Sequence, residues 1–293
     1  MTMLDLLSKY PIKTVTPLEE DYPRMLRYIK DPPSLLYYRG DIKIASNICI
    51  SVVGSRHATG YGKWAAQMLG RKLAEYEIVT VSGMATGIDT YAHKGSLGNK
   101  GKTIAVFGCG VDVCYPKTNK DLMMEILENG LVLSEFPPEF QPTNYSFPIR
   151  NRIISGLSAG TVIVEAGISS GSLITAEYAA EQGRSLYAVP GNINNIFSIG
   201  TNKLIKDGAV PITVIDDIID ELGLQRRESV QLKATLGKDE IIIYEVIESG
   251  SETTVDSICK TTGKGAGEVN AMITVLEMKG LIYSCMGKIF VAK

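Results

Sequence analysis

Short apolar runs recur between residues 48 and 191, and most of them end at a glycine. Their sequences are "ICISVVG", "IVTVSG", "KTIAVFG", "LVLSEF", "GTVIVEAG" and "SLYAVPG". Each run has the length of a strand, and most are rich in valine and isoleucine. Continuous apolar runs of this composition are typical of parallel strands that are buried on both faces. We therefore predict a buried, mostly parallel sheet.

Helical patterns lie between these runs. After the first run, apolar residues repeat at helical spacing at Ala65, Met68, Leu69 and Leu73. A later segment, "SLITAEYAAEQG", has Ser172 as its expected N-cap and stops at Gly183. The alternation of strand and helix predicts an α/β fold with a doubly wound sheet, which we place at residues 45–222.

The two flanks have different patterns. Residues 1–44 lack periodicity and contain Pro23, Pro32 and Pro33, so we expect an extended lead-in with one short helix. Residues 223–238 are polar and predict a linker.

Residues 239–293 predict a separate small domain. Three helical segments, "DEIIIYEVIESG", "TTVDSICKTTG" and "EVNAMITVLEMKG", precede two strands that turn near Gly287. Thr253 with Asp256 predicts a capping box at the start of the second helix. This order of elements is typical of a winged helix, and a small helical adaptor is the alternative interpretation.

Composition narrows the class of protein. The formal net charge of −2 argues against a protein that coats nucleic acid by charge alone, so a polyanion partner needs a local basic patch. The five cysteines have scattered spacings, and the N-terminus has no secretory signal, which predicts reduced thiols and a cytoplasmic location. No apolar run reaches the roughly 18 residues of a membrane helix, so we expect no membrane partner.

Three glycine-rich turns follow predicted strands. They are "VVGSRHATGYG", "SGMATGID" and "EAGISSGSLITAE". Parallel strands end at one edge of a sheet, so the three turns are expected to converge where α/β folds bind ligands. Main-chain N–H groups at such turns bind anions, most commonly phosphate. The first turn matches neither the dinucleotide pattern nor the P-loop, so neither NAD nor ATP gains support.

The stretch "FPIRNRIISGL" places two arginines in an apolar segment. Pro148 suits the first turn of a helix. Steps of about 100° per residue then place Arg150 beside the apolar stripe and Arg152 roughly 160° away from it. At most one of the two is therefore expected to contact a phosphate, while the other braces the fold. Phe147 offers a flat face for a base, or it packs in the core.

Catalytic and metal chemistry gain little support. The chain has only two histidines, His57 and His93, and Cys109 and Cys114 have no second ligand pair nearby for zinc. The sequence "GISSG" departs by one place from a nucleophile elbow. His93 with Asp89 is a conceivable acid–base pair, but a pair with this helical spacing is more often structural.

Several of these motifs together resemble the DNA-processing protein A family, also called DprA or Smf. They are "VVGSRHATGYG", "SGMATGID", "FPIRNRIISGLSAGTVIVEAGISSGSLITAEYAAEQGR" and "AVPGN", and the resemblance runs from about Tyr22 to Ala209. It implies an extended Rossmann-type fold with a C-terminal winged helix. It further implies a single-stranded-DNA-binding dimer that helps load the RecA recombinase on incoming strands during natural transformation, with no cofactor and no enzymatic activity.

The resemblance implies specific DNA-binding positions. The family's G-x-R-x-x-[ST] turn falls on Gly54, Arg56 and Thr59, its R-N-R element on residues 150–152 and its S-G-S element on residues 170–172. With the neighbouring turns, the expected set is Gly54, Ser55, Arg56, Thr59, Gly83, Phe147, Arg150, Asn151, Arg152, Ser170, Gly171, Ser172, Asn202 and Lys203.

Two departures from the family stand out. Only about 44 residues precede the predicted sheet domain, where many members carry a further N-terminal domain, and the slightly acidic balance predicts salt-sensitive binding. Two other functions stay open. One is a nucleotide phosphoribohydrolase of related fold, because Glu177 follows the third turn, although that family's P-G-G-x-G-T-x-x-E pattern is missing. The other is an adaptor that acts through its winged helix.

Overall fold

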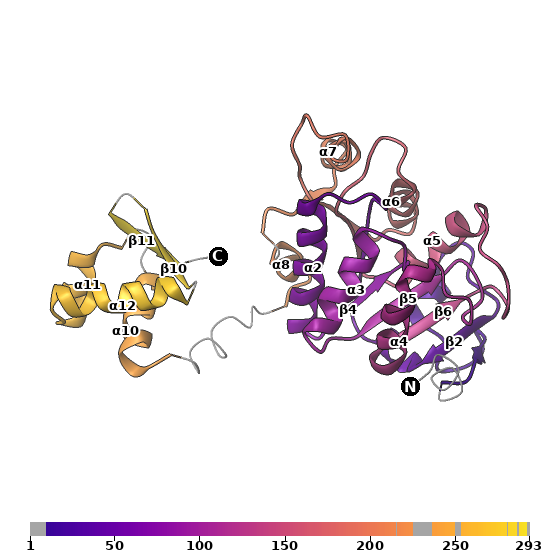
Figure 1. Ribbon diagram of the computed structural model, residues 1–293, viewed down its shortest axis with the longest axis horizontal. Helices are drawn as coiled ribbons and strands as arrows, with labels where there is room; N and C mark the ends of the chain where they lie inside the picture. The colour runs from indigo at the N-terminus through magenta and orange to yellow at the C-terminus, as the bar shows by residue number, and fades with distance from the viewer. Residues whose placement is uncertain are drawn as a thin grey trace. The chain divides into compact units, whose positions relative to one another are not determined.

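The chain forms two compact units, residues 1–218 and 219–293. The structure is a computed structural model, and it describes residues 10–214, 216–224, 236–249, 253–279, 281–285 and 287–291. Figure 1 shows the two units, which are described separately below. The predicted linker at residues 223–238 lies mostly outside the described residues.

The first unit is built around a sheet with the strand order β1-β2-β6-β5-β4-β3-β7-β8-β9. From β6 to β9 in this order, the strands are parallel to one another. They are β3 (Cys49–Val53), β4 (Val79–Ser82), β5 (Thr103–Phe107), β6 (Leu131–Ser134), β7 (Gly160–Ile163), β8 (Ser185–Ala188) and β9 (Val210–Pro211). Strands β3 to β7 are buried along their whole length, as their apolar runs predict. The predicted α/β class is confirmed.

Two antiparallel strands extend the sheet at one edge. Strands β1 (Lys13–Val15) and β2 (Leu36–Gly40) pair with each other, and β2 pairs with β6. The residues predicted as an extended lead-in therefore belong to the sheet. This segment also contains two short helical turns, η1 (Arg24–Tyr28) and η2 (Ile42–Ser46), where one short helix was expected. The apolar run at β2, "LLYY", is only four residues long and follows Pro32 and Pro33, so the proline-rich pattern of the segment did not predict a strand.

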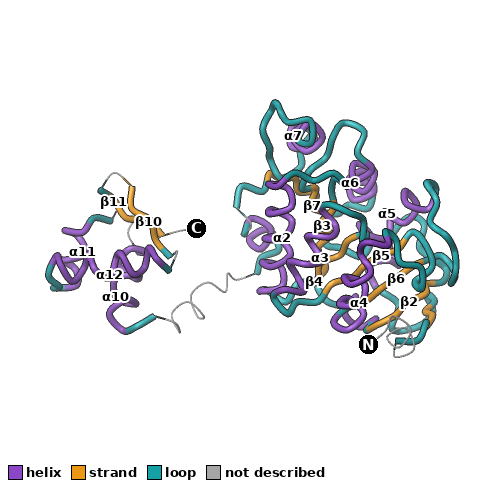
Figure 2. Tube along the Cα trace, viewed as in Figure 1, coloured by secondary structure: helices purple, strands orange, loops and turns teal. Residues whose placement is uncertain are grey.

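Helices cover both faces of the sheet (Figures 1 and 2). Alternate residues of β5 show this two-sided core, because Ile104 and Val106 pack with α5 residues while Ala105 and Phe107 pack with α4 residues. The helices are α2 (Gly60–Glu75), α3 (Ile88–Gly98), α4 (Lys120–Asn129), α5 (Ser146–Gly156), α6 (Gly171–Glu181), α7 (Ile199–Lys206) and α8 (Asp217–Glu221), with a short turn η3 (Lys117–Asn119) before α4.

The order of the strands reverses between β3 and β7. The chain runs from β3 through β4 and β5 to β6 on one side, and it then returns to place β7 on the other side of β3. The Ser51 hydroxyl of β3 donates to the Thr161 hydroxyl of β7 over 2.7 Å across this boundary. Ligands of open α/β sheets bind beyond the carboxyl ends of strands at such a switch point.

The second unit is a winged helix. Its elements are α10 (Lys238–Ser249), α11 (Val255–Thr262), α12 (Ala266–Met278) and an antiparallel pair, β10 (Ile282–Cys285) and β11 (Lys288–Val291). The capping box is formed by Thr254 and Ser257, one residue beyond the predicted pair. Thr253 instead forms a bridge with Ile289, which holds α11 against the hairpin.

Candidate nucleic-acid interface

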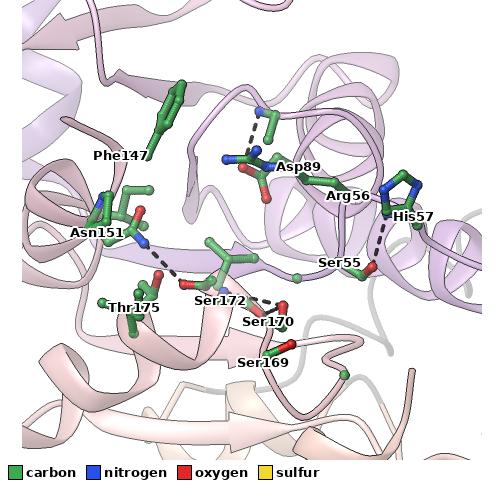
Figure 3. Close-up of a pocket in the computed structure, with 18 of the residues that line it drawn as sticks. Ser55, Arg56, His57, Asp89, Phe147, Asn151, Ser169, Ser170, Ser172 and Thr175 are labelled. Carbon is green, nitrogen blue, oxygen red and sulfur yellow. Dashed lines mark hydrogen bonds between the residues drawn. The ribbon is translucent and has the colours of Figure 1, made fainter. Parts of the chain in front are cut away.

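A cleft of about 480 Å³ lies at the switch point of the sheet. The turn after β3, the turn after β7 and the start of α5 line it. Figure 3 shows Phe147 and Asn151 of α5 across from Ser55 and Arg56, with the serines of the β7 turn below them. Ala85 and Asp89 of the second glycine-rich turn also line the cleft, so the predicted convergence of the three turns is realised.

The turn after β3 presents an exposed arginine. The Ser55 hydroxyl accepts a hydrogen bond from the His57 amide over 3.0 Å, and the Ser55 amide donates to the Glu165 carbonyl over 2.7 Å. Thr59 caps α2 by accepting from the Gly62 amide over 3.1 Å. With both ends of the turn bonded to the fold, the Arg56 side chain between them stays exposed in the cleft wall.

A buried glutamate that the sequence interpretation missed holds this turn in place. The Glu165 carboxylate accepts from the Thr59 amide over 2.9 Å and from the Thr59 hydroxyl over 2.5 Å. A Cβ on Gly62 would overlap the Glu165 carboxyl group, so glycine is required there. The sequence did contain an indication of this role, because Glu165 lies at the end of the apolar run "GTVIVEAG". A charged group directly after a buried strand needs a polar partner.

Arg150 lies beneath the cleft and is only 4% exposed. Its guanidinium donates to the Gly83 carbonyl over 2.7 Å and to the Val106 carbonyl. Burial lowers the pKa of Arg150 to about 10, against the opposing attraction of Asp89, so the group stays charged at neutral pH. A Cβ on Gly83 would overlap the guanidinium, so glycine makes this approach possible.

Arg152 points to a different partner. It donates to the two carboxylate oxygens of Glu135 over 2.7 and 2.8 Å, and its Nε lies 3.5 Å from an Asp31 oxygen. The residue is 8% exposed and does not line the cleft. The two arginines thus have separate partners, in agreement with the directions derived from helical geometry, and both are buried.

Asp89 and His93, considered above as a conceivable acid–base pair, are not bonded to each other and have structural partners. The Asp89 carboxylate accepts from the Gly83 and Ala85 amides over 3.1 and 3.3 Å, whereas His93 Nδ1 lies 2.7 Å from the Thr103 hydroxyl. Burial raises the pKa of Asp89, although Arg150 opposes this effect. Burial, with a smaller contribution from Arg150, lowers the pKa of His93 to about 3. Asp89 lines the cleft, whereas His93 is fully buried outside its lining.

Phe147 is half-buried at the mouth of the cleft, and the guanidinium groups of two arginines lie close to its ring. The guanidinium carbon of Arg56 lies 5.1 Å from its ring centre, and that of Arg150 lies 5.9 Å away. The Tyr115 ring, which the sequence interpretation did not single out, lies 5.6 Å away at an angle of 30°. Tyr115 is 44% exposed, so it adds an aromatic surface beside Phe147.

The turn after β7 leads into α6. Ser170 caps this helix by accepting from the Ser172 amide over 3.4 Å, so the cap lies two residues before the predicted one. The Asn151 amide donates to the Gly171 carbonyl over 3.3 Å, which joins α5 to the turn. The N-terminus of α6 therefore faces the cleft, and its dipole favours an anion there.

The structure brings together most of the predicted DNA-binding residues. Those that line the cleft are Gly54, Ser55, Arg56, Phe147, Arg150, Asn151, Ser170, Gly171 and Ser172. Gly83 lines an adjoining hollow, and Thr59 supports the first turn. Asn202 lies outside the lining because its side chain bonds to the amide and carbonyl of Gly191, and Lys203 is exposed on α7. Glu177 also lies outside the lining.

These features define a class of protein: a Rossmann-type α/β unit with a cationic, glycine-rich cleft, followed by a winged helix. Within the part of the chain that the structure describes, every helix is too short or too polar to cross a membrane. The family model "DNA recombination-mediator protein A" matches residues 13–223, and the model "DprA winged helix domain" matches residues 227–288.

Individual relatives agree with the family models. DNA processing protein DprA of Streptococcus pneumoniae is 45% identical over 213 residues, which cover 73% of this chain and 74% of the relative. Protein Smf of Escherichia coli is 37% identical over 277 residues, which cover 92% of this chain and 74% of the relative. A structure of DNA processing protein A from Helicobacter pylori, described by its single-stranded DNA binding mode, has a TM-score of 0.67 at 35% identity and covers 73% of this chain and 97% of that one. The chain belongs to the DNA recombination-mediator protein A family.

Proposed function

We propose that this chain binds single-stranded DNA in the cleft beyond the carboxyl ends of β3 and β7. The observation that carries the proposal is the exposed Arg56 guanidinium beside the Phe147 ring, across from the N-terminus of α6. A guanidinium and free helix amides bind phosphates, and an aromatic face stacks on a base. The similar Helicobacter pylori protein, described by its single-stranded DNA binding mode, supports the same ligand.

The cleft residues have distinct parts in this binding. Arg56 pairs with a phosphate, and the Gly171 amide together with the Ser170 and Ser172 hydroxyls binds the next one. Phe147 stacks on a base. Gly54, Ser55 and Thr59 shape the first turn, and Arg150 supplies a fixed positive charge beneath it. Arg152 positions α5 through Glu135 and stays out of contact with DNA.

Contacts of this kind favour a mediator of recombination. Backbone charges and one stacked base read no sequence, so any strand binds and most of its base edges stay free for pairing. We therefore propose that the chain acts as a cytoplasmic homodimer without a cofactor, protects incoming DNA during natural transformation and helps to load RecA. Asn202 and Lys203 lie on α7, outside the lining of the cleft, and we assign them to the outer part of the DNA path.

Replacing Arg56 with alanine tests the assignment. We expect about a 10-fold loss of affinity for oligothymidylate, because a charge-assisted contact to phosphate is lost. The slope of log affinity against log salt should fall by about 0.7, the value for one phosphate on a single strand. Fluorescence anisotropy across a salt series measures both quantities.

Arg71→Ala is the matched control, because Arg71 lies on α2, is 60% exposed and pairs with Glu75. Equal losses in both variants, or an unchanged affinity in Arg56→Ala, would remove Arg56 from the site. A chain that ends at residue 222 should keep single-strand binding, and complete loss there would favour the winged-helix adaptor. Release of base from nucleoside monophosphates without DNA binding would favour the enzyme.

A further inference from the structure

A second cleft of about 500 Å³ adjoins the one described above. Arg56 and His57 line both clefts. A smaller hollow of about 160 Å³ shares Arg56, Phe147 and Arg150 with the first cleft, and Arg56 and Thr86 with the second. The three hollows therefore adjoin one another along a single groove, with Arg56 in the wall of each.

Two lysines flank a tyrosine in the second cleft. Lys63 Nζ lies 5.7 Å from the centre of the Tyr91 ring, and Lys94 Nζ lies 5.9 Å from the same centre. Lys63 and Tyr91 line the cleft, and Lys94 is exposed one helical turn beyond. Neither lysine forms an ion pair with any described residue, and every described lining residue of this cleft is neutral or basic.

Two other polar side chains of the second cleft are bonded within the protein. The Asn119 amide donates to the Met84 carbonyl over 2.8 Å and to the Thr90 hydroxyl over 2.9 Å. The Thr90 hydroxyl donates in turn to the Ala85 carbonyl over 2.7 Å. The positive charges at this cleft are therefore those of Arg56, which it shares with the first cleft, and of the two lysines. A lysine ammonium acts as a point charge for phosphate and reads no base.

We propose that the groove is one continuous path for a nucleic-acid strand, in which Lys63 and Lys94 bind phosphates beyond the Arg56 contact. This inference rests on the proposed binding of single-stranded DNA in the first cleft. It adds a second electrostatic subsite on α2 and α3. Tyr115 lies in the connecting hollow beside Phe147, so the path has aromatic surface between its two cationic parts.

The subsite predicts a dependence on strand length. A short oligothymidylate of about 5 nucleotides fills the first cleft only, whereas one of about 20 nucleotides reaches both. In the full chain, Lys63→Ala with Lys94→Ala should weaken binding of the long strand roughly 2- to 30-fold, the combined range for two exposed charge pairs. Its salt slope should fall by about 1.4, whereas binding of the short strand should not change.

The control is Lys43→Ala with Lys102→Ala. Both lysines are exposed and precede strands β3 and β5, so they lie at the opposite edge of the sheet, and the double change removes the same charge. This variant should bind both strands as the wild type does. Equal weakening by the two double variants would mean that net charge alone acts, and it would overturn the subsite.

Further outcomes separate the subsite from the proposed function. If the wild type binds neither strand, the proposed function fails. If it binds both and the Lys63/Lys94 variant binds the long strand unchanged, the subsite alone fails. If that variant loses the short strand equally, the lysines belong to the first cleft and the extended path is wrong.

Lysine acylation followed by mass spectrometry gives a second measurement. The long strand should protect Lys63 and Lys94 from acylation, and the short strand should leave both reactive.

Discussion

Replacing Arg150 with methionine removes the positive charge beneath the cleft while keeping a long side chain. The change leaves the Gly83 and Val106 carbonyls without this donor and leaves the buried Asp89 carboxylate without the attraction of the Arg150 guanidinium. An orphaned buried acceptor costs about 1–3 kcal/mol, and removal of one member of a buried charge pair costs about 3–5 kcal/mol. These costs overlap, so we expect a total loss of about 3–5 kcal/mol.

A loss of this size is large for a domain whose free energy of unfolding is about 5–15 kcal/mol. For a unit of about 200 residues, the melting temperature falls by about 2–4 °C for each kcal/mol, which predicts a decrease of roughly 6–20 °C. Urea denaturation followed by circular dichroism gives the free energy, and a thermal melt gives the temperature. Arg56→Met is the matched control, because Arg56 is exposed, and it should stay within about 0.5 kcal/mol of the wild type.

A second change tests whether the loss of stability comes from the unpaired Asp89 carboxylate. Asp89→Asn keeps an oxygen that can accept from the Gly83 and Ala85 amides but removes the negative charge. If the cost of Arg150→Met comes from an unpaired buried carboxylate, the double variant should be more stable than Arg150→Met alone. A loss below about 1 kcal/mol in Arg150→Met, together with weaker DNA binding, would refute the bracing role and make Arg150 a direct DNA contact.

Two further predictions concern His93 and Gly83, which are both buried near Arg150. The pKa of His93 is about 3 in the folded state and near 6.5 in the unfolded state. Below pH 6.5 the unfolded state therefore takes up a proton that the folded state does not, so the folded state loses stability as the pH falls. The free energy of unfolding should decrease by about 2 kcal/mol between pH 7 and pH 5. Urea denaturation at both pH values should show this loss in the wild type and in His57→Gln but not in His93→Gln, and an equal loss in all three would contradict the assignment. Gly83→Ala should destabilise the fold by about 1–3 kcal/mol, because its Cβ overlaps the Arg150 guanidinium. Gly98→Ala, at an exposed helical position with open space, should be neutral or stabilising in the same thermal melt.

The sheet and its switch point could be predicted from the chain because buried parallel strands have a distinctive apolar pattern. Strand β2 could not, because its apolar run, "LLYY", is only four residues long and directly follows a proline-rich segment, and its pairing with β1 and β6 is not visible in the sequence. Propensity is a weak guide to such a strand, where tertiary pairing decides the conformation.

The arginines of α5 show a similar division. Their opposite directions follow from the helical repeat alone, and the structure agrees. Their burial does not follow, because the Arg150 acceptors Gly83 and Val106 lie 67 and 44 residues away in sequence. The contribution of Glu165 is equally non-local, since its partner Thr59 is 106 residues distant. Short-range patterns contain no information about such partners.

The place of β7 beside β3 has a consequence for how the chain acquires its function. Ser51 and Thr161 meet across 110 residues, so this contact is strongly non-local and is of the kind that slows folding. The turn after β3 depends on the Glu165 carboxylate, which follows β7 in the chain. A growing chain therefore lacks the partner of the Arg56 turn until β7 has been synthesised, which ties the shape of this turn to completion of the sheet.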